Sequence, residues 1–151
     1  MQVFLPYPDL KQSVCCLDPK RLGNQVYREC LTIIRGSWPN HPVSKMWADY
    51  IPTLAQYALY GVNELKRRGL DYYNRDWYHE LADKVVLFAD TTDDDYFWEP
   101  PWLGNESLHS SHRAALLYKD YNWYSKFGWS EQPAVPNEKG RLPYYWPVVI
   151  D

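Results

Sequence analysis

The stretch DPKRLGNQVYRECLTIIRG, residues 18–36, carries the strongest helical pattern in the sequence. Its first two residues, Asp18 and Pro19, are typical of a helix start, because a carboxylate can cap free N–H groups and proline fits the first turn. Apolar residues then recur at helical spacing up to Gly36, at Leu22, Val26, Cys30 and Ile33 or Ile34. The stretch therefore predicts an amphipathic helix whose other side carries Arg21, Gln25, Arg28, Glu29 and Thr32.

The rest of the chain predicts further helices and no convincing strand. Apolar spacing indicates helices at about 44–68, 75–88 and 106–124, whereas residues 1–17 are predicted to form an extended arm. Residues 90–105 combine aspartates with Pro100-Pro101 and predict a loop, and prolines make the tail irregular. A chain of 151 residues has the size of one domain. We therefore expect an all-α fold, a single compact helical domain spanning residues 1–151, with an extended N-terminal arm and an irregular C-terminal tail.

Composition narrows the class of protein. Hydrophobic residues make up 46% of the chain, which excludes a disordered protein, and no apolar run is long enough to span a membrane. The N-terminus lacks the basic start and long apolar stretch of a signal peptide. The cysteines, Cys15, Cys16 and Cys30, show no metal-binding spacing and favour reduced thiols. The sequence thus indicates a cytoplasmic protein, which we expect to be a monomer.

Charge is distributed unevenly along the chain. The formal net charge is −3, yet residues 18–45 carry five Lys or Arg residues against Asp18 and Glu29 alone. Acidic residues concentrate between Asp90 and Glu106. This distribution predicts a basic surface on an otherwise acidic protein. It also predicts that the acidic loop around residues 93–95 faces away from that surface, because carboxylates beside a phosphate path repel DNA.

Three ordered groups of motifs extend over most of the chain. The first is LDPKRLGNQ followed by YRE, residues 17–25 and 27–29. The second is WPNHP, KMW and ELKRRG, at 38–42, 45–47 and 64–69, and the third is WLGNE, HSSHR and YSKFGW, at 102–106, 109–113 and 124–129. In this order they resemble the pyrimidine-dimer DNA glycosylase family, in particular a bacterial and phage branch of it. The resemblance implies a repair enzyme that excises ultraviolet pyrimidine dimers from double-stranded DNA, with coupled AP-lyase activity.

The resemblance also implies a mechanism. Family members of the repair type use a primary amine that attacks C1′ of the damaged nucleotide and forms a Schiff base, without a metal or cofactor. An α-amine, with an ordinary pKa of about 7.7–8.0 against about 10.4 for lysine, is far more often neutral at pH 7. Because the large residue Gln2 follows Met1, we expect the initiator methionine to remain and to supply this amine, with Lys45 as the alternative.

The family's catalytic carboxylate maps to Glu29 by the same resemblance. The interval from Arg21 to Glu29 is one residue longer than in the family pattern, and a small offset in the helix would absorb it. Glu29 would stabilise the cationic sugar and imine and would transfer a proton in the elimination. An ion pair with a surface arginine is the alternative role.

Contacts with DNA are expected from a set of polar side chains in the same motifs: Arg21, Gln25, Arg28, His41, Lys45, His109, His112 and Arg113. A loop-locking hydrogen bond is the alternative for His41. His109 and His112 lie three apart on a helix, but no third ligand stands out, so no metal site is predicted. Two other functions stay open: a glycosylase for another modified or damaged base, and a non-catalytic relative that binds DNA or protein.

Overall fold

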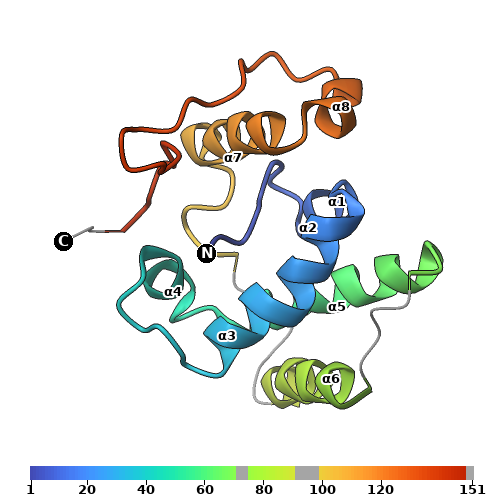
Figure 1. The fold of residues 1–151 in the computed structure, drawn as a ribbon. Helices are drawn as coiled ribbons and strands as arrows, with labels where there is room; N and C mark the ends of the chain where they lie inside the picture. Colours follow the sequence, from blue (N-terminus) through green and yellow to red (C-terminus); the bar gives the residue numbers. More distant parts are fainter. Residues whose placement is uncertain (71–74, 91–98, 149–151) are drawn as a thin grey trace.

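The computed structural model describes residues 1–70, 75–90 and 99–148, and these ranges contain helices, turns and irregular segments (Figure 1). The elements, in chain order, are α1 (Leu10–Cys15), α2 (Pro19–Asn24), the π-helical turn η1 (Gln25–Cys30), α3 (Leu31–Ile34), α4 (Pro42–Trp47), α5 (Ile51–Arg67), α6 (Arg75–Asp90), α7 (Glu106–Lys119), α8 (Tyr121–Tyr124) and the 3₁₀ turn η2 (Ser125–Phe127). The predicted all-α class is confirmed. None of the described helices is long and apolar enough to cross a membrane.

Helix α5 lies at the centre of the fold. It packs against α1, the α2–η1–α3 rod and α6, and nine of its residues are buried. The closest approach is at Gly61, where the rod crosses α5 and leaves no room for a side chain. A Cβ atom on Gly61 would lie 2.4 Å from Val26 Cγ2 and 3.0 Å from Val14 Cγ2. Both neighbours are stiff, β-branched side chains, so the contact cannot relax cheaply.

Overpacking a core usually costs about 1–3 kcal/mol, and the stiff neighbours place Gly61→Ala in the upper part of that range. The gain in helix propensity, about 1 kcal/mol, is smaller than that cost. After this gain, the free energy of unfolding is expected to fall by about 1–2 kcal/mol. Asn63→Ala is the matched control, because position 63 is exposed on the same helix. Urea denaturation of both variants measures the effect. A Gly61→Ala protein as stable as the control would mean that α5 and the rod do not pack this closely.

The predicted helix at 18–36 forms as one continuous rod, but its middle is π-helical. Helix α2 runs into η1 at Gln25, and η1 runs into α3 at Leu31, with helical backbone angles at both junctions. A π turn accommodates one extra residue in an otherwise α-helical rod. The turn includes Glu29, so the rod contains a local offset of the kind expected between Arg21 and Glu29.

Several predicted boundaries are wrong. The helix expected at 44–68 is two helices, α4 and α5, because Pro52 removes a hydrogen-bond donor and disfavours helical geometry at the preceding residue. The arm is extended only to Asp9, whose side chain accepts a hydrogen bond from the Gln12 N–H at 2.7 Å and starts α1. Asp18 stands at the start of α2 without capping it, and instead pairs with Arg21 at 3.1 Å.

The N-terminal arm and the described part of the tail both lie against α7. The N-terminal arm runs between α7 and the α2–η1–α3 rod, and the tail after η2 passes along α7 without helical structure (Figure 1). The tail is attached to α7 by hydrogen bonds from the Ala134 N–H to the Ala114 carbonyl and from the Tyr145 N–H to Ser111 Oγ.

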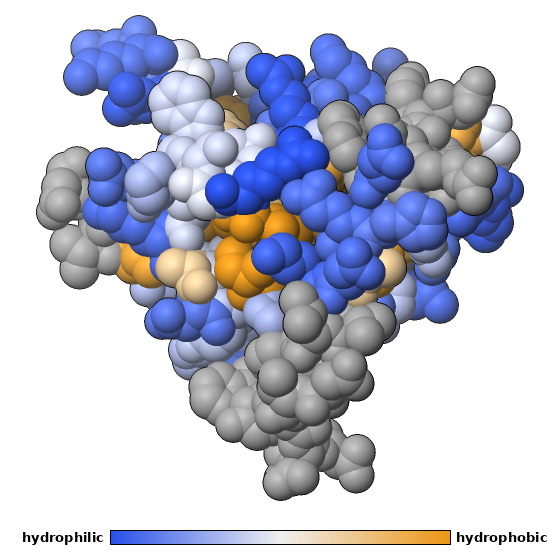
Figure 2. Space-filling model, turned by 90° about the horizontal axis from the view of Figure 1, so that it is seen from below, coloured by the Kyte–Doolittle hydropathy of each residue, from blue (hydrophilic) through white to orange (hydrophobic). Residues whose placement is uncertain are grey.

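Seen from below, the described surface is mostly hydrophilic around a small apolar area (Figure 2). The acidic stretch 93–95 lies outside the described residues, so its position stays a prediction.

Candidate active site

A groove with a volume of about 760 Å³ brings together segments that are far apart in the sequence. Its walls come from the N-terminus, the α2–η1 rod, the start of α4, the end of α7 and the tail. The lining residues are Met1, Gln2, Phe4, Lys20, Arg21, Asn24, Gln25, Glu29, His41, Pro42, Lys119, Gly140, Arg141, Leu142, Tyr144 and Trp146. Met1, Arg21, Gln25, Glu29 and His41, which the sequence analysis selected, therefore share one site.

The groove is strongly cationic although the chain as a whole is acidic. Lys20, Arg21, Lys119 and Arg141 line it together with the amine of Met1, and Glu29 is the one carboxylate among its described lining residues. Such a distribution attracts a polyanion such as a DNA backbone. It also leaves a single negative side chain where positive charge can develop during a reaction.

Glu29 combines a shielded position with nearby cations. The side chain is half-buried in η1, and this desolvation raises the pKa of its carboxyl above the ordinary value. The positive charge of the Met1 amine opposes the rise, followed by the charges of Arg28 and Lys119. A carboxylate with a raised pKa that shares a groove with an amine has the properties expected of a proton-transfer group.

His41 makes the loop-locking hydrogen bond and also lines the groove, and its contact with DNA stays a prediction. Its Nδ1 accepts a hydrogen bond from the Val43 N–H at 3.1 Å and so caps α4. Its ring lies in the groove wall, edge-on to Trp146 with ring centroids 6.0 Å apart. Partial burial lowers the pKa of His41, and the charge of the Met1 amine lowers it further. The ring is therefore neutral near pH 7 and available as a hydrogen-bonding group.

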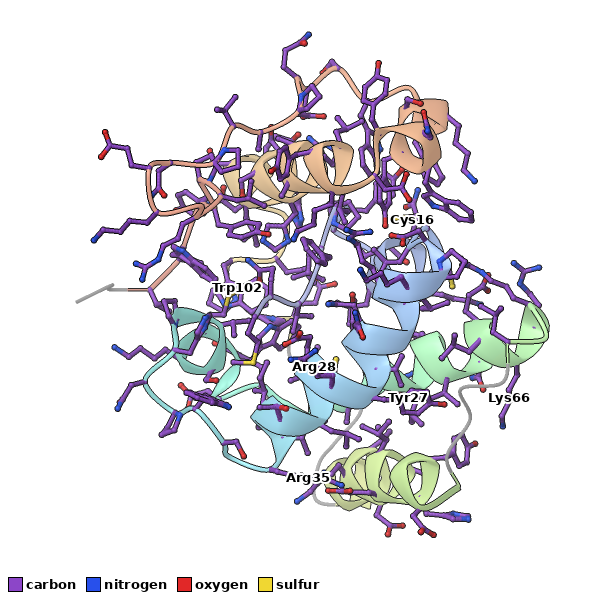
Figure 3. All side chains as sticks on the ribbon, viewed as in Figure 1. Cys16, Tyr27, Arg28, Arg35, Lys66 and Trp102 are labelled. Carbon is purple, nitrogen blue, oxygen red and sulfur yellow. The ribbon has the colours of Figure 1, made fainter. Side chains whose placement is uncertain are left out.

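Arg28 and Lys45 do not line the groove. Arg28 is exposed on η1, in the middle of the rod in Figure 3, and Lys45 is half-buried on α4. Contacts of these two side chains with DNA stay predictions, since a long duplex can extend beyond the groove. As the alternative nucleophile, Lys45 is disfavoured by its absence from the lining.

The prediction that His109 and His112 contact DNA is wrong. Neither side chain is exposed, and both bind the backbone of the N-terminal arm instead. His112 Nδ1 accepts the Leu5 N–H at 2.8 Å, and His109 Nδ1 lies 2.7 Å from the Leu5 carbonyl oxygen. Among the described residues no cluster of three metal-ligating groups occurs.

The predicted DNA contact of Arg113 is likewise replaced by internal bonds. Its guanidinium donates to both carboxylate oxygens of Glu131 at 2.9 Å and to the Pro6 carbonyl at 2.9 Å, and it also pairs with Glu106. Only 11% of the side chain is exposed. Arg113 therefore ties the arm to the tail, and α7 contributes Lys119 to the groove in its place.

Lys119 and Arg141 were missed by the sequence analysis. Partial burial lowers the pKa of Lys119, with Arg21 and Lys20 lowering it further and Glu29 opposing them. Lys119 ends a helix, where a cation usually signals only a favourable interaction with the helix dipole. Arg141 lies in the irregular tail, where no periodic pattern indicates which way a side chain faces.

Tryptophans near the predicted motifs belong mainly to the core. Trp47 is fully buried, and Trp102 donates from Nε1 to the Met46 carbonyl at 3.3 Å and packs edge-on against Trp47, beside α4 in Figure 3. Trp38, by contrast, is 71% exposed in the turn before His41. Core packing therefore accounts for the positions of Trp47 and Trp102, without a ligand.

Comparison with known proteins supports the resemblance. A family model described as pyrimidine dimer DNA glycosylase matches residues 1–80. The chain belongs to this family. Family membership makes it a DNA glycosylase of DNA repair, with DNA as its substrate. No curated protein and no solved structure matches the chain.

The family model covers some of the residues that line the groove of this glycosylase and does not cover the others. Met1, Arg21, Gln25, Glu29 and His41 lie within residues 1–80, whereas Lys119 and the tail residues 140–146 lie beyond them. The amine, the carboxylate and the rod that carries it thus come from the part of the chain that the family model covers.

Proposed function

We propose that the protein excises pyrimidine dimers from ultraviolet-damaged, double-stranded DNA through a Schiff base on the Met1 amine, with coupled AP-lyase activity. The observation that carries the proposal is the pairing of Met1 and Glu29 in one cationic groove, with the amine's charge acting on the Glu29 carboxyl. The four surrounding cations supply the phosphate contacts that binding needs.

The reaction starts with attack by the neutral amine. The Met1 nitrogen forms a bond to C1′ while the bond from C1′ to the base breaks, and the base leaves with the bonding electrons and takes up a proton from the solvent. The sugar ring then opens, O4′ takes up one of the two amine protons, and C1′ becomes an imine that keeps the other proton and a positive charge. In the lyase step a proton leaves C2′ and the bond from C3′ to oxygen breaks, which nicks the strand.

Glu29 has two tasks in this sequence. Its negative charge stabilises the cationic sugar and the protonated imine, a stabilisation that a partly desolvated site makes stronger. Its carboxylate can also receive the proton from C2′, and a raised pKa favours that uptake near neutral pH. Lys119 and Arg21, which also line the groove, are then left to hold the phosphates.

Borohydride trapping tests this proposal directly. The full chain is mixed with duplex oligonucleotides that carry one cyclobutane dimer, one abasic site, one other damaged base or no lesion, and borohydride reduces any imine to a stable adduct. We expect an adduct and a nicked strand with the dimer and the abasic site, and none with intact DNA. Peptide mapping of the adduct is expected to place it on Met1.

Each other result changes the assignment. An adduct on a lysine would replace Met1 as the nucleophile. Base release only from a different damaged base would change the substrate and keep the chemistry. Specific binding of DNA without base release, nicking or adduct would identify a non-catalytic relative.

The state of the cysteines bears on where the protein acts. All three are free thiols in the structure, which fits the reducing cytoplasm. We expect the protein to act there as a monomer.

A further inference from the structure

The backbone of the N-terminal arm is held by side chains rather than by a neighbouring strand. Tyr57 Oη donates to the Phe4 carbonyl at 2.8 Å, the two histidines of α7 bind both backbone groups of Leu5, and Arg113 donates to Pro6. Ser13 Oγ donates to the Tyr7 carbonyl at 2.8 Å and accepts from its N–H at 3.0 Å. Residues 4–7 are thereby fixed against α5, α7 and α1.

Gln25 makes the anchor nearest to the chain terminus. Its Nε2 donates to the Gln2 carbonyl at 2.9 Å, and its Oε1 accepts the Phe4 N–H at 2.8 Å. The side-chain amide thus replaces the two groups that a neighbouring β-strand would offer. The Gln25 side chain is 2% exposed, so these bonds are shielded from water, and removing one partner leaves the other unsatisfied.

The position of Gln25 on the rod links this anchor to Glu29. The two residues lie four apart within η1, about one turn of the same helix, and both line the groove. One end of this short helical unit therefore holds the carbonyl of residue 2, and the other end carries the carboxylate. The residue held in this way is Gln2, which follows Met1 directly. A single peptide bond therefore links it to the residue that carries the amine.

We propose that Gln25 is a positioning residue that fixes the Met1 amine relative to the Glu29 carboxylate. The proposal rests on the function proposed above, because it assumes that the amine is the nucleophile. It replaces the predicted contact of Gln25 with DNA, since an amide that is 2% exposed and bound to residues 2 and 4 is shielded from a phosphate. A misplacement of about 1 Å in a reacting group can cost about 10²-fold in rate.

The experiment compares Gln25→Met with Tyr57→Phe. Gln25→Met keeps the length of the side chain and removes both bonds to the arm. Tyr57→Phe is the control, because it removes an equally buried bond of similar length to residue 4, together with a longer contact of 3.4 Å from Tyr57 Oη to Gln25 Oε1. Both bonds of Gln25 to residues 2 and 4 stay possible in this variant. Single-turnover rates of borohydride adduct formation are measured on an abasic duplex, with affinity measured on the same duplex and folding by circular dichroism.

We expect Gln25→Met to slow adduct formation by about 10–10²-fold and to leave the affinity for DNA within about twofold of the wild type. Tyr57→Phe is expected to stay within about threefold in both quantities. Gln25→Glu is a second variant with a distinctive pH profile. When protonated, its carboxyl can still donate to the Gln2 carbonyl and accept from Phe4, so its rate relative to the wild type should rise as the pH falls.

The outcomes separate this proposal from the proposed function. If the wild type forms no adduct, the proposed function fails. If the wild type forms the adduct and Gln25→Met forms it equally fast, the positioning role is wrong and the proposed function stands. Equal losses in Gln25→Met and Tyr57→Phe would assign the effect to general packing of the arm. Loss of folding in both Gln25 variants would make Gln25 a structural residue alone, which also overturns the proposal.

Discussion

Glu29→Gln is expected to slow base release by about 10²–10⁴-fold, or roughly 3–5 kcal/mol of activation free energy, the usual contribution of one acid–base group. The amide has the shape of the carboxylate but cannot balance the positive charge that develops on the sugar and the imine during base release. In the later lyase step it also cannot accept the proton from C2′. Binding of DNA is expected to stay intact or to strengthen slightly, since the substitution removes the one described negative side chain from a groove lined by four cations.

The measurement is single-turnover base release from a duplex with one cyclobutane dimer, with affinity determined on the same duplex. Glu138→Gln is the matched control, because Glu138 is exposed in the tail and does not line the groove. The control is expected to retain the wild-type rate. Equal rates for wild type and Glu29→Gln would remove Glu29 from the catalytic machinery. A large loss of affinity in Glu29→Gln would instead indicate that the carboxylate holds the groove together.

The fold could be predicted where one apolar side faces the core over several turns. The rod from Pro19 to Ile34 and the helices α6 and α7 show this pattern, and all three form. The apolar pattern did not reveal that α4 and α5 are separate helices. Apolar residues continue at helical spacing past Pro52, but the helical backbone hydrogen bonds are interrupted before it. It also missed α1, whose six residues are too few to display a helical period.

The site could be predicted only in the part that the family resemblance covers. Met1, Arg21, Glu29 and His41 were selected from motifs, and the groove contains all four. His109 and Arg113 were misassigned because their partners come from distant parts of the chain: the Leu5 carbonyl for His109, and the Pro6 carbonyl together with the Glu131 carboxylate for Arg113. No sequence pattern reveals which distant groups the fold brings next to these side chains. A polar side chain on an amphipathic helix has the same sequence signature whether it faces DNA or a buried backbone group.

Acidification from pH 7 to pH 5 is expected to lower the free energy of unfolding by about 2 kcal/mol through His112 alone. In the folded protein this fully buried ring accepts the Leu5 N–H at Nδ1, which requires the neutral form. Burial lowers the pKa of His112 to about 3, with a smaller effect from the charge of His109, whereas an unfolded chain has the ordinary value of about 6.5.

Between pH 6.5 and pH 3 the unfolded chain therefore binds a proton that the folded chain does not. Stability is complete above the unfolded pKa and falls as the pH falls through this window, by about 1.4 kcal/mol per pH unit. The range above pH 5 separates the histidines from most carboxylates. The pKa values of His41 and His109 are also lowered, so these two contribute in the same window and are removed only by comparison with a His112 variant. Glu64, whose pKa is lowered to about 2 mainly by its hydrogen bond with Arg67, loses its contribution only below the ordinary carboxylate range.

His112→Asn is the matched variant, because its side-chain oxygen can accept the Leu5 N–H and does not titrate. Urea denaturation at pH 7, 6 and 5 is expected to show a decline about 2 kcal/mol smaller in His112→Asn than in the wild type. Other groups, including Glu29 with its raised pKa, are common to both proteins and cancel in the comparison. Parallel declines would mean that His112 is protonated in the folded protein. The Leu5 N–H would then have lost its acceptor, and the arm that carries the Met1 amine would be held by Gln25, Tyr57, His109 and Arg113 without His112.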